Sequence, residues 1–286
     1  MSPPNPVEAS ANCGTSNEIE MSESEEGLEV YAYPCPCRYC SEYIAEATDY
    51  CEQDTRILKH TEEVSRILIQ CPNTITLVVG PRQTRLKCHK ALLAFKSEYF
   101  DAAFFGNFAS RNNDEFRMEL EDPKAMSTFV SWLYTGRISS TCVVAPAVLW
   151  VLGDRLRSPG FTNTAMHFIF ADYTMTYINA ETAEYIYDNT STGSKLRTFV
   201  KDLVLHEGPL SGDYGADKEN AWRELIRQGG DLVIDVALEG SFTCGNSEQE
   251  DRPHDSSNHS KYLEPITTRP IEDFLEGKPR EGTRKI

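Results

Sequence analysis

The stretch Arg85-Leu-Lys-Cys-His-Lys-Ala-Leu-Leu-Ala-Phe-Lys-Ser-Glu-Tyr-Phe-Asp-Ala-Ala-Phe104 decides the fold, because one hydrophobic pattern changes into another within it. Residues 75–79, just before it, are rich in β-branched side chains and end at Gly80, which predicts a strand. A second short strand is expected at 84–88. From residue 89 the apolar side chains recur every three or four positions, which indicates helix. Ser97 is a favourable helix N-cap, so we expect two consecutive helices.

Further elements are expected on both sides of this stretch. The period of 53–70 predicts an amphipathic helix that ends before Pro72. Apolar residues alternate with charged ones over 116–120, which predicts a third, half-buried strand. Asp122-Pro123 is a strong helix start, and Gly136 is suited to cap the end of that helix. More helices are expected at 146–157, 161–173, 180–188, 193–206, 217–228 and 230–238.

Three strings in this region resemble the signature of the BTB/POZ domain, a protein-interaction fold. They are His89-Lys90-x-x-Leu93, Ser97-x-Tyr99-Phe100 and Trp132-Leu133-Tyr134-Thr135-Gly136-Arg137. The resemblance implies an α+β fold with a small β-sheet flanked by a cluster of α-helices. It also implies a non-enzymatic scaffold or adaptor that works by binding proteins. The run 187–197 is similar to the extension of many fungal BTB proteins. The chain therefore resembles the fungal type of BTB-domain protein.

Composition, together with this resemblance, divides the 286-residue chain into four regions. Residues 1–52 are predicted to be an acidic, disordered region with a Cys-rich segment, 53–175 a BTB/POZ domain with its preceding helix, and 176–238 a helical extension. Residues 239–286 are rich in Gly, Ser, Asn, Glu and Pro, so we expect a disordered tail. The apolar islands 262–266 and 271–275 interrupt the tail and are candidate peptide motifs for a partner.

The resemblance also implies a homodimer, because longer family members carry a dimerisation helix where 57–70 lies. The apolar stripe on this helix needs a surface to cover it, either the chain's own core or, as the resemblance implies, a second subunit. Dimeric members often place an Asp before the first core strand, facing a basic residue near the His. Here Thr74 replaces the acid, whereas Lys87 keeps the basic position. The predicted dimer interface comprises Ile57, Leu58, Val64, Ile67, Leu68, Thr74 and Lys87.

A second implied partner is a cullin, the scaffold of a ubiquitin ligase. Cullin-binding members carry an apolar-x-Glu motif in the loop after the second helix, and the matching residues here are Phe108, Ala109 and Ser110. The apolar anchor is present, but Ser replaces Glu. Losing a charged hydrogen bond costs on the order of 1.5–3 kcal/mol, which is tenfold or more in affinity. Phe108 would act as a binding anchor if exposed and would close the edge of the core if buried.

Charge and cysteine content limit the other classes of function. The formal net charge of −16 and the pI near 4.8 disfavour binding to nucleic acid. No run of 18 apolar residues occurs, so we expect no membrane span. Residues 1–6 lack the start of a secretory signal, and the cysteines number nine. We therefore expect a reduced, intracellular protein of the cytoplasm or nucleus.

The cysteines and histidines supply two further candidates. Cys35, Cys37, Cys40 and Cys51 include one C-x-x-C spacing and form a candidate zinc site, although the usual second pair is missing. The alternative is a reduced, aromatic-rich loop. Cys88 and His89 suggest a nucleophile pair, but strand neighbours point to opposite faces and no third group orients them. We interpret His89 as structural and expect no enzyme, no catalytic residue and no required cofactor.

Overall fold

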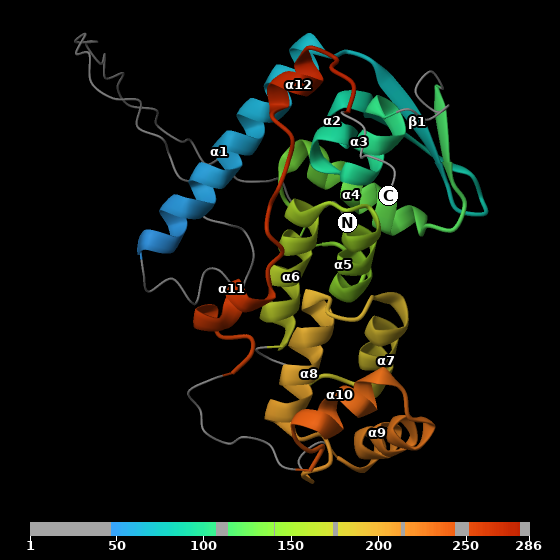
Figure 1. Ribbon diagram of the computed structural model, residues 1–286, viewed down its shortest axis with the longest axis vertical. Helices are drawn as coiled ribbons and strands as arrows, with labels where there is room; N and C mark the ends of the chain where they lie inside the picture. Colours follow the sequence, from blue (N-terminus) through green and yellow to red (C-terminus); the bar gives the residue numbers. More distant parts are fainter. Residues whose placement is uncertain are drawn as a thin grey trace, which may run out of the picture. The chain divides into compact units, whose positions relative to one another are not determined.

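The computed structural model describes residues 47–106, 114–139, 141–173, 177–212, 215–243 and 252–280, with side chains from residue 55 onward. In this part of the chain, a three-stranded sheet lies at one edge of a cluster of helices, which confirms the predicted α+β class (Figure 1). The strands are β1 (Thr74–Val79), β2 (Thr84–His89) and β3 (Glu115–Met118). The helices around them are α1 (Ala47–Gln70), α2 (Lys90–Lys96), α3 (Glu98–Phe105), α4 (Pro123–Thr135), α5 (Pro146–Arg155) and α6 (Pro159–Tyr173).

The sheet has the strand order β2-β1-β3. β1 pairs antiparallel with β2, so that Thr74 lies opposite His89, and parallel with β3, so that Val79 lies opposite Met118. A parallel pair needs a crossover connection, and α2 and α3 lie in it. β3 ends at Met118, so the predicted alternation stops early: Leu120, placed by it on the buried face, is 95% exposed.

The helix ends follow the predicted capping residues. The Ser97 hydroxyl accepts a hydrogen bond from the Phe100 amide at 3.3 Å and separates α2 from α3. The Asp122 carboxylate accepts hydrogen bonds from the first amides of α4. Gly136 ends α4 with a φ of 69°, and a Cβ there would lie 3.1 Å from the His60 ring. Both the left-handed backbone and the close approach of α1 require glycine at this position.

Aromatic side chains from α3, α4 and α6 form the centre of the domain core. Phe129 has no exposed surface and lies 5.1 Å from Phe161 and 6.0 Å from Trp132, measured between ring centroids. Phe100 stacks on Phe129 at 6.4 Å. The Trp132 indole donates a hydrogen bond to the Thr164 hydroxyl at 3.1 Å, so its polar edge is satisfied. The aromatic residues of the 89–104 stretch that are buried therefore serve packing.

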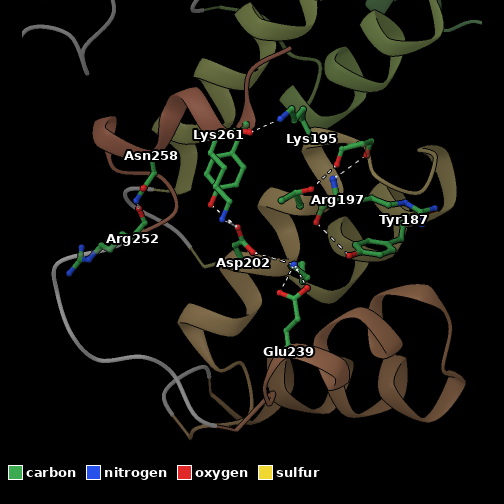
Figure 2. A network of polar contacts seen from close by, with 12 residues as sticks. Tyr187, Lys195, Arg197, Asp202, Glu239, Arg252, Asn258 and Lys261 are labelled. Atoms are coloured by element: carbon green, nitrogen blue, oxygen red, sulfur yellow. Dashed lines mark hydrogen bonds and ion pairs between the residues drawn. The ribbon is translucent and has the colours of Figure 1, made fainter. Parts of the chain in front are cut away.

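The extension predicted at 176–238 consists of α7 (Ala180–Asn189), α8 (Lys195–Glu207), α9 (Ala216–Gln228) and α10 (Asp231–Glu239). Arg197 on α8 is 8% exposed and joins three of its parts. Its guanidinium donates to the carbonyl of Tyr187 at 2.5 Å (Figure 2) and to that of Thr190 at 2.6 Å, and it pairs with Asp231 at 2.9 Å. A buried guanidinium with these partners holds the α7–α8 turn against the start of α10.

The tail differs from its prediction. The segment 252–280, expected to be disordered, carries η2 (Ser256–Asn258), α11 (His259–Tyr262) and α12 (Ile271–Leu275). Asp202 on α8 accepts hydrogen bonds from Lys261 at 2.6 Å and from the Tyr262 hydroxyl at 2.9 Å (Figure 2). Residues 263–270 then run beside α6, where Asn163 exchanges two hydrogen bonds with the backbone of Glu264 (Figure 1). Both predicted apolar islands lie in this docked segment. Its polar composition predicted disorder, because composition does not show contacts with residues elsewhere in the chain.

Candidate functional site

Cys88, His89 and Tyr134 form a hydrogen-bonded group between β2 and α4. The Tyr134 oxygen lies 3.1 Å from the His89 amide nitrogen and 2.9 Å from His89 Nδ1, and its hydroxyl is 3.5 Å from Cys88 Sγ. Cys88 is 1% exposed, and burial raises the pKa of its thiol to about 11. A buried thiol at physiological pH is a poor nucleophile because the reactive form is the thiolate. The group therefore locks the strand to the helix, which agrees with the structural interpretation of His89.

The predicted dimerisation stripe on α1 divides into a buried part and an exposed part. Val64 is 6% exposed and Ile67 has no exposed surface, because both belong to the core of the chain itself. This differs from the prediction that they cover a second subunit. Leu58 and Leu68 are 59% and 38% exposed, whereas Ile57 is half-buried. The face of α1 that remains open to a partner is thus smaller than the sequence suggests.

The inner side of α1 meets α4 and α2. The His60 Nε2–H donates to the Leu133 carbonyl at 3.0 Å, and burial lowers the pKa of His60. Glu63 pairs with Lys96 of α2 at 2.6 Å, and both side chains are largely buried. The periodicity of 53–70 could not distinguish contacts within the chain from contacts with a second subunit, because both need the same apolar stripe.

The two residues of the predicted charge pocket lie on the first two strands. Thr74, half-buried, begins β1, and Lys87, exposed, lies on β2 opposite Thr76. Phe108, Ala109 and Ser110 lie outside the described residues, as do Cys35, Cys37, Cys40 and the side chain of Cys51. Among the side chains that the structure does describe, no three His, Cys, Asp or Glu residues are grouped so that they could hold a metal ion.

A surface that the sequence analysis missed receives the end of the tail. We call it the tail groove and define it by Arg66 and Cys71 beside the end of α1, Phe95 on α2, and Asp101 and Phe105 on α3. In Figure 1, α12 lies against the C-terminal end of α1 and beside α2, and contacts between these helices agree with that view. The groove thus combines apolar walls with one acid, Asp101, and one base, Arg66.

Phe274 is the apolar anchor of the docked segment. It is 2% exposed, with its ring centroid 5.7 Å from that of Phe95 and 5.4 Å from that of Phe105, both edge-to-face. Burying a phenylalanine stabilises a contact by about 1.5–3 kcal/mol. The Phe274 carbonyl also accepts a weak hydrogen bond from Cys71 Sγ at 3.5 Å. Phe274 is therefore the aromatic side chain through which α12 contacts the groove.

Asp101 is the polar anchor of the tail groove. It is 3% exposed, and its carboxylate lies 2.7 Å from Arg269 Nη1 and 3.7 Å from Arg280 Nη1. Burial raises the pKa of Asp101, whereas the two arginines oppose that rise. Arg280 also donates through its backbone amide to the Phe105 carbonyl at 2.8 Å and through its guanidinium to the Glu98 carbonyl at 3.0 Å. Two guanidinium groups from the tail thus compensate one buried charge.

One signal in the sequence pointed to this groove. Asp101 follows Phe100 directly and precedes Phe104 by three residues, so it lies at the edge of the buried face of α3. A carboxylate in that place needs a cation, but nothing local shows that the cation comes from Arg269. The separation of 168 residues between the two side chains explains why pattern reasoning did not connect them.

Comparisons with known proteins agree with the predicted domain. A family model for the BTB/POZ domain matches residues 70–171. Human Kelch-like protein 30 is 39% identical over 67 residues, which cover 23% of this chain and 11% of that protein. Human Kelch-like protein 5 is 29% identical over 150 residues, which cover 51% of this chain and 18% of that protein. The chain thus matches less than a fifth of the length of each of these two relatives.

Residues 70–171 are therefore a BTB/POZ domain, as the three strings predicted. Because these relatives are human proteins, the similarity of 187–197 to fungal extensions stays a prediction. The segment of the tail at 252–280 lies outside the matched range, and so does nearly all of α1. No helix among the described residues is both long and apolar enough to cross a bilayer.

Proposed function

We propose that this protein is an intracellular, non-enzymatic adaptor, in which the BTB/POZ domain binds one protein and another surface holds a second. The match of residues 70–171 to the BTB/POZ domain carries the proposal. The buried Cys88 thiol supports a structural role for the residues that most resemble a nucleophile pair. Cys71, Cys88 and Cys142 are free cysteines, in keeping with a reducing compartment.

Homodimerisation is the first interaction that we propose, with Leu58 and Leu68 of α1 at its centre. Exposed leucines on one helix are suited to an isologous contact between two copies. Light scattering coupled to size-exclusion chromatography of the full chain should give the mass of a dimer. The double substitution Leu58→Glu with Leu68→Glu should give a monomer, whereas Leu120→Glu, at another exposed leucine, should remain dimeric. A monomeric wild type would contradict this part of the proposal.

Cullin binding is the second proposed interaction, and it rests on the resemblance of Phe108, Ala109 and Ser110 to the family motif. Tagged full-length protein should co-purify a cullin, and Phe108→Ala should abolish the capture. Ser110→Glu restores the acid that the family pattern contains, so affinity should rise about tenfold. Leu120→Ala is the matched control. Failure of both wild type and Ser110→Glu to bind a purified cullin at micromolar concentrations would exclude this partner.

A zinc-binding regulatory protein is the alternative function, favoured by the Cys37-x-x-Cys40 spacing. The ligands would be Cys35, Cys37, Cys40 and Cys51, and a tetrahedral site of four thiolates is a usual structural arrangement for zinc. Elemental analysis of the purified full chain distinguishes the two functions. One zinc per chain that is lost with Cys37→Ser would favour the alternative, whereas substoichiometric zinc that Cys37→Ser does not change would exclude it.

A further inference from the structure

The contacts of the tail have the form of peptide recognition. A continuous run from Arg269 to Arg280 places one aromatic side chain between Phe95 and Phe105. Two arginines at its ends meet the same carboxylate, that of Asp101. The backbone amide of Arg280 completes the seat by donating to the Phe105 carbonyl. An aromatic anchor, a charge clamp and backbone hydrogen bonds together define both the identity and the direction of a bound segment.

The walls of the groove lie on helices that the domain itself positions. Phe95, Asp101 and Phe105 lie on α2 and α3, two helices that the domain positions through its own core and the Ser97 cap. By contrast, α12 has five residues and lacks a side-chain N-cap. Its conformation follows from docking, since an isolated helix of that length is unstable in water. The asymmetry between a preformed receptor and a short segment that folds against it is typical of a peptide site.

The charges of Asp101 and Arg66 determine which side chains a bound segment needs. Asp101 has the two tail arginines as its ion-pair partners, so removal of the tail leaves its carboxylate without them. The Asp101 carboxylate, which lies among the apolar walls of the groove, favours a cationic ligand. Arg66 at the opposite side pairs with Glu272 at 3.0 Å and favours an acid between the arginine and the phenylalanine. The guanidinium of Arg269 also lies 4.7 Å from the centroid of the Phe274 ring, which preorganises the motif.

We propose that the tail groove is a docking site for partner proteins that carry an arginine followed five residues later by a phenylalanine in a short helix. Residues 269–280 occupy the site in cis and exchange with that partner segment. Tethering gives the tail an effective concentration in the millimolar range, so contacts of modest intrinsic strength keep it seated. A cavity of about 80 Å³ lined by residues that include Lys96, Thr267 and Arg157 remains beside the seated tail, so the groove has room for a somewhat larger ligand.

The test uses the full chain and a fluorescein-labelled peptide of residues 266–280. The receptor is the double variant Phe274→Ala with Arg269→Gln, in which the tail has lost both anchors. In fluorescence anisotropy, the peptide should bind this variant at least about tenfold more tightly than it binds wild type, where the tail competes. The same peptide carrying Phe274→Ala should lose at least about tenfold in affinity, and a peptide with Arg269→Gln and Arg280→Gln should lose as much.

The peptide substitutions leave the receptor protein unchanged. The test therefore needs no substitution of the buried Asp101, which could prevent the chain from folding. Equal affinity for wild type and the double variant would overturn the proposal, as would a peptide whose two anchors can be replaced without effect. A wild-type dimer that becomes monomeric in the double variant would also overturn it, since the tail would then sit on a second copy. The outcome is independent of the adaptor function, because neither Leu58, Leu68 nor Phe108 is changed.

Discussion

Phe129 and Phe274 are 0% and 2% exposed, but the helices that carry them differ in how their sequences specify them. Phe129 lies on the 13-residue α4, which has an Asp122 cap at its start and Gly136 in the left-handed conformation at its end. Phe274 lies on the five-residue α12, which follows Pro270 and has no side-chain cap. Local signals are sufficient to predict the first helix. The second depends on Phe95, Asp101 and Phe105 in the tail groove. Mutations in the two helices should therefore differ in their effects on stability.

The largest effect is expected for Phe129→Ala. Removing a fully buried ring from the aromatic core should lower the global free energy of unfolding by about 3–5 kcal/mol. Chemical denaturation of the full chain measures the change, and Leu120→Ala, at a 95% exposed side chain, should stay within about 0.5 kcal/mol of wild type. A loss below about 1 kcal/mol at Phe129 would mean that the aromatic residues are not packed as the structure shows.

Arg197→Met should cause the next largest loss of stability. It tests the helical extension α7–α10 in the same way. Methionine keeps much of the side-chain volume but leaves the carbonyls of Tyr187 and Thr190 without their donor. Loss of a buried, hydrogen-bonded charge should lower stability by about 2–4 kcal/mol. Hydrogen exchange should accelerate in α7 and α10 before it does in the sheet. Arg227→Met, at a side chain that is 71% exposed, is the control and should change little.

Phe274→Ala should have a smaller and strictly local effect. The substitution removes the apolar anchor, so the docked state of the tail should weaken by about 1.5–3 kcal/mol. Hydrogen exchange should accelerate over 263–280, while the midpoint of global unfolding changes little. Glu276→Ala, on an exposed side chain of the same segment, should leave exchange unchanged. Faster exchange throughout β1 and α4 would instead show that the tail is an integral part of the domain core.

The smallest effect is expected from Glu207, at the end of α8, as the pH changes. Burial raises the pKa of its carboxyl from an ordinary value of 4.5 to about 8. The folded state therefore binds a proton between those values that the unfolded state releases, so this group's contribution to stability falls as pH rises from 4.5 to 8. The loss between pH 5 and 8 should be on the order of 2 kcal/mol, because the partly exposed side chain retains some hydration.

Glu207→Gln should remove this part of the pH dependence. Its amide carbonyl can still accept the hydrogen bond that Ile178 N–H donates at 3.3 Å, so the folded geometry should be retained. Denaturation at a series of pH values measures the difference between the two proteins. Parallel stability curves for wild type and Glu207→Gln would show that the carboxyl does not titrate in this range.

The α1 stripe and the tail groove show which features sequence patterns do not predict. The stripe on α1 was recognised as apolar, but only contacts with α4 and the rest of the core assign Val64 and Ile67 to the interior of the chain. The exposed Leu58 and Leu68 have the same helical periodicity as those buried residues. Periodicity identifies a face and not the object that covers it. The tail groove was missed because Asp101 and Arg269 are distant in sequence, so no local pattern connects them.

The sequence by itself determined the BTB/POZ domain and those helix ends that carry a capping residue. Ser97, Asp122 and Gly136 act through hydrogen bonds and backbone angles within a few residues, and the strings around His89 and Trp132 belong to the domain that the family model matches. Only the tertiary structure decided the order of 252–280 and the burial of Val64 and Ile67 in the α1 stripe. Those features depend on contacts between residues far apart in the chain, and the pattern within one segment does not show which distant residues it contacts.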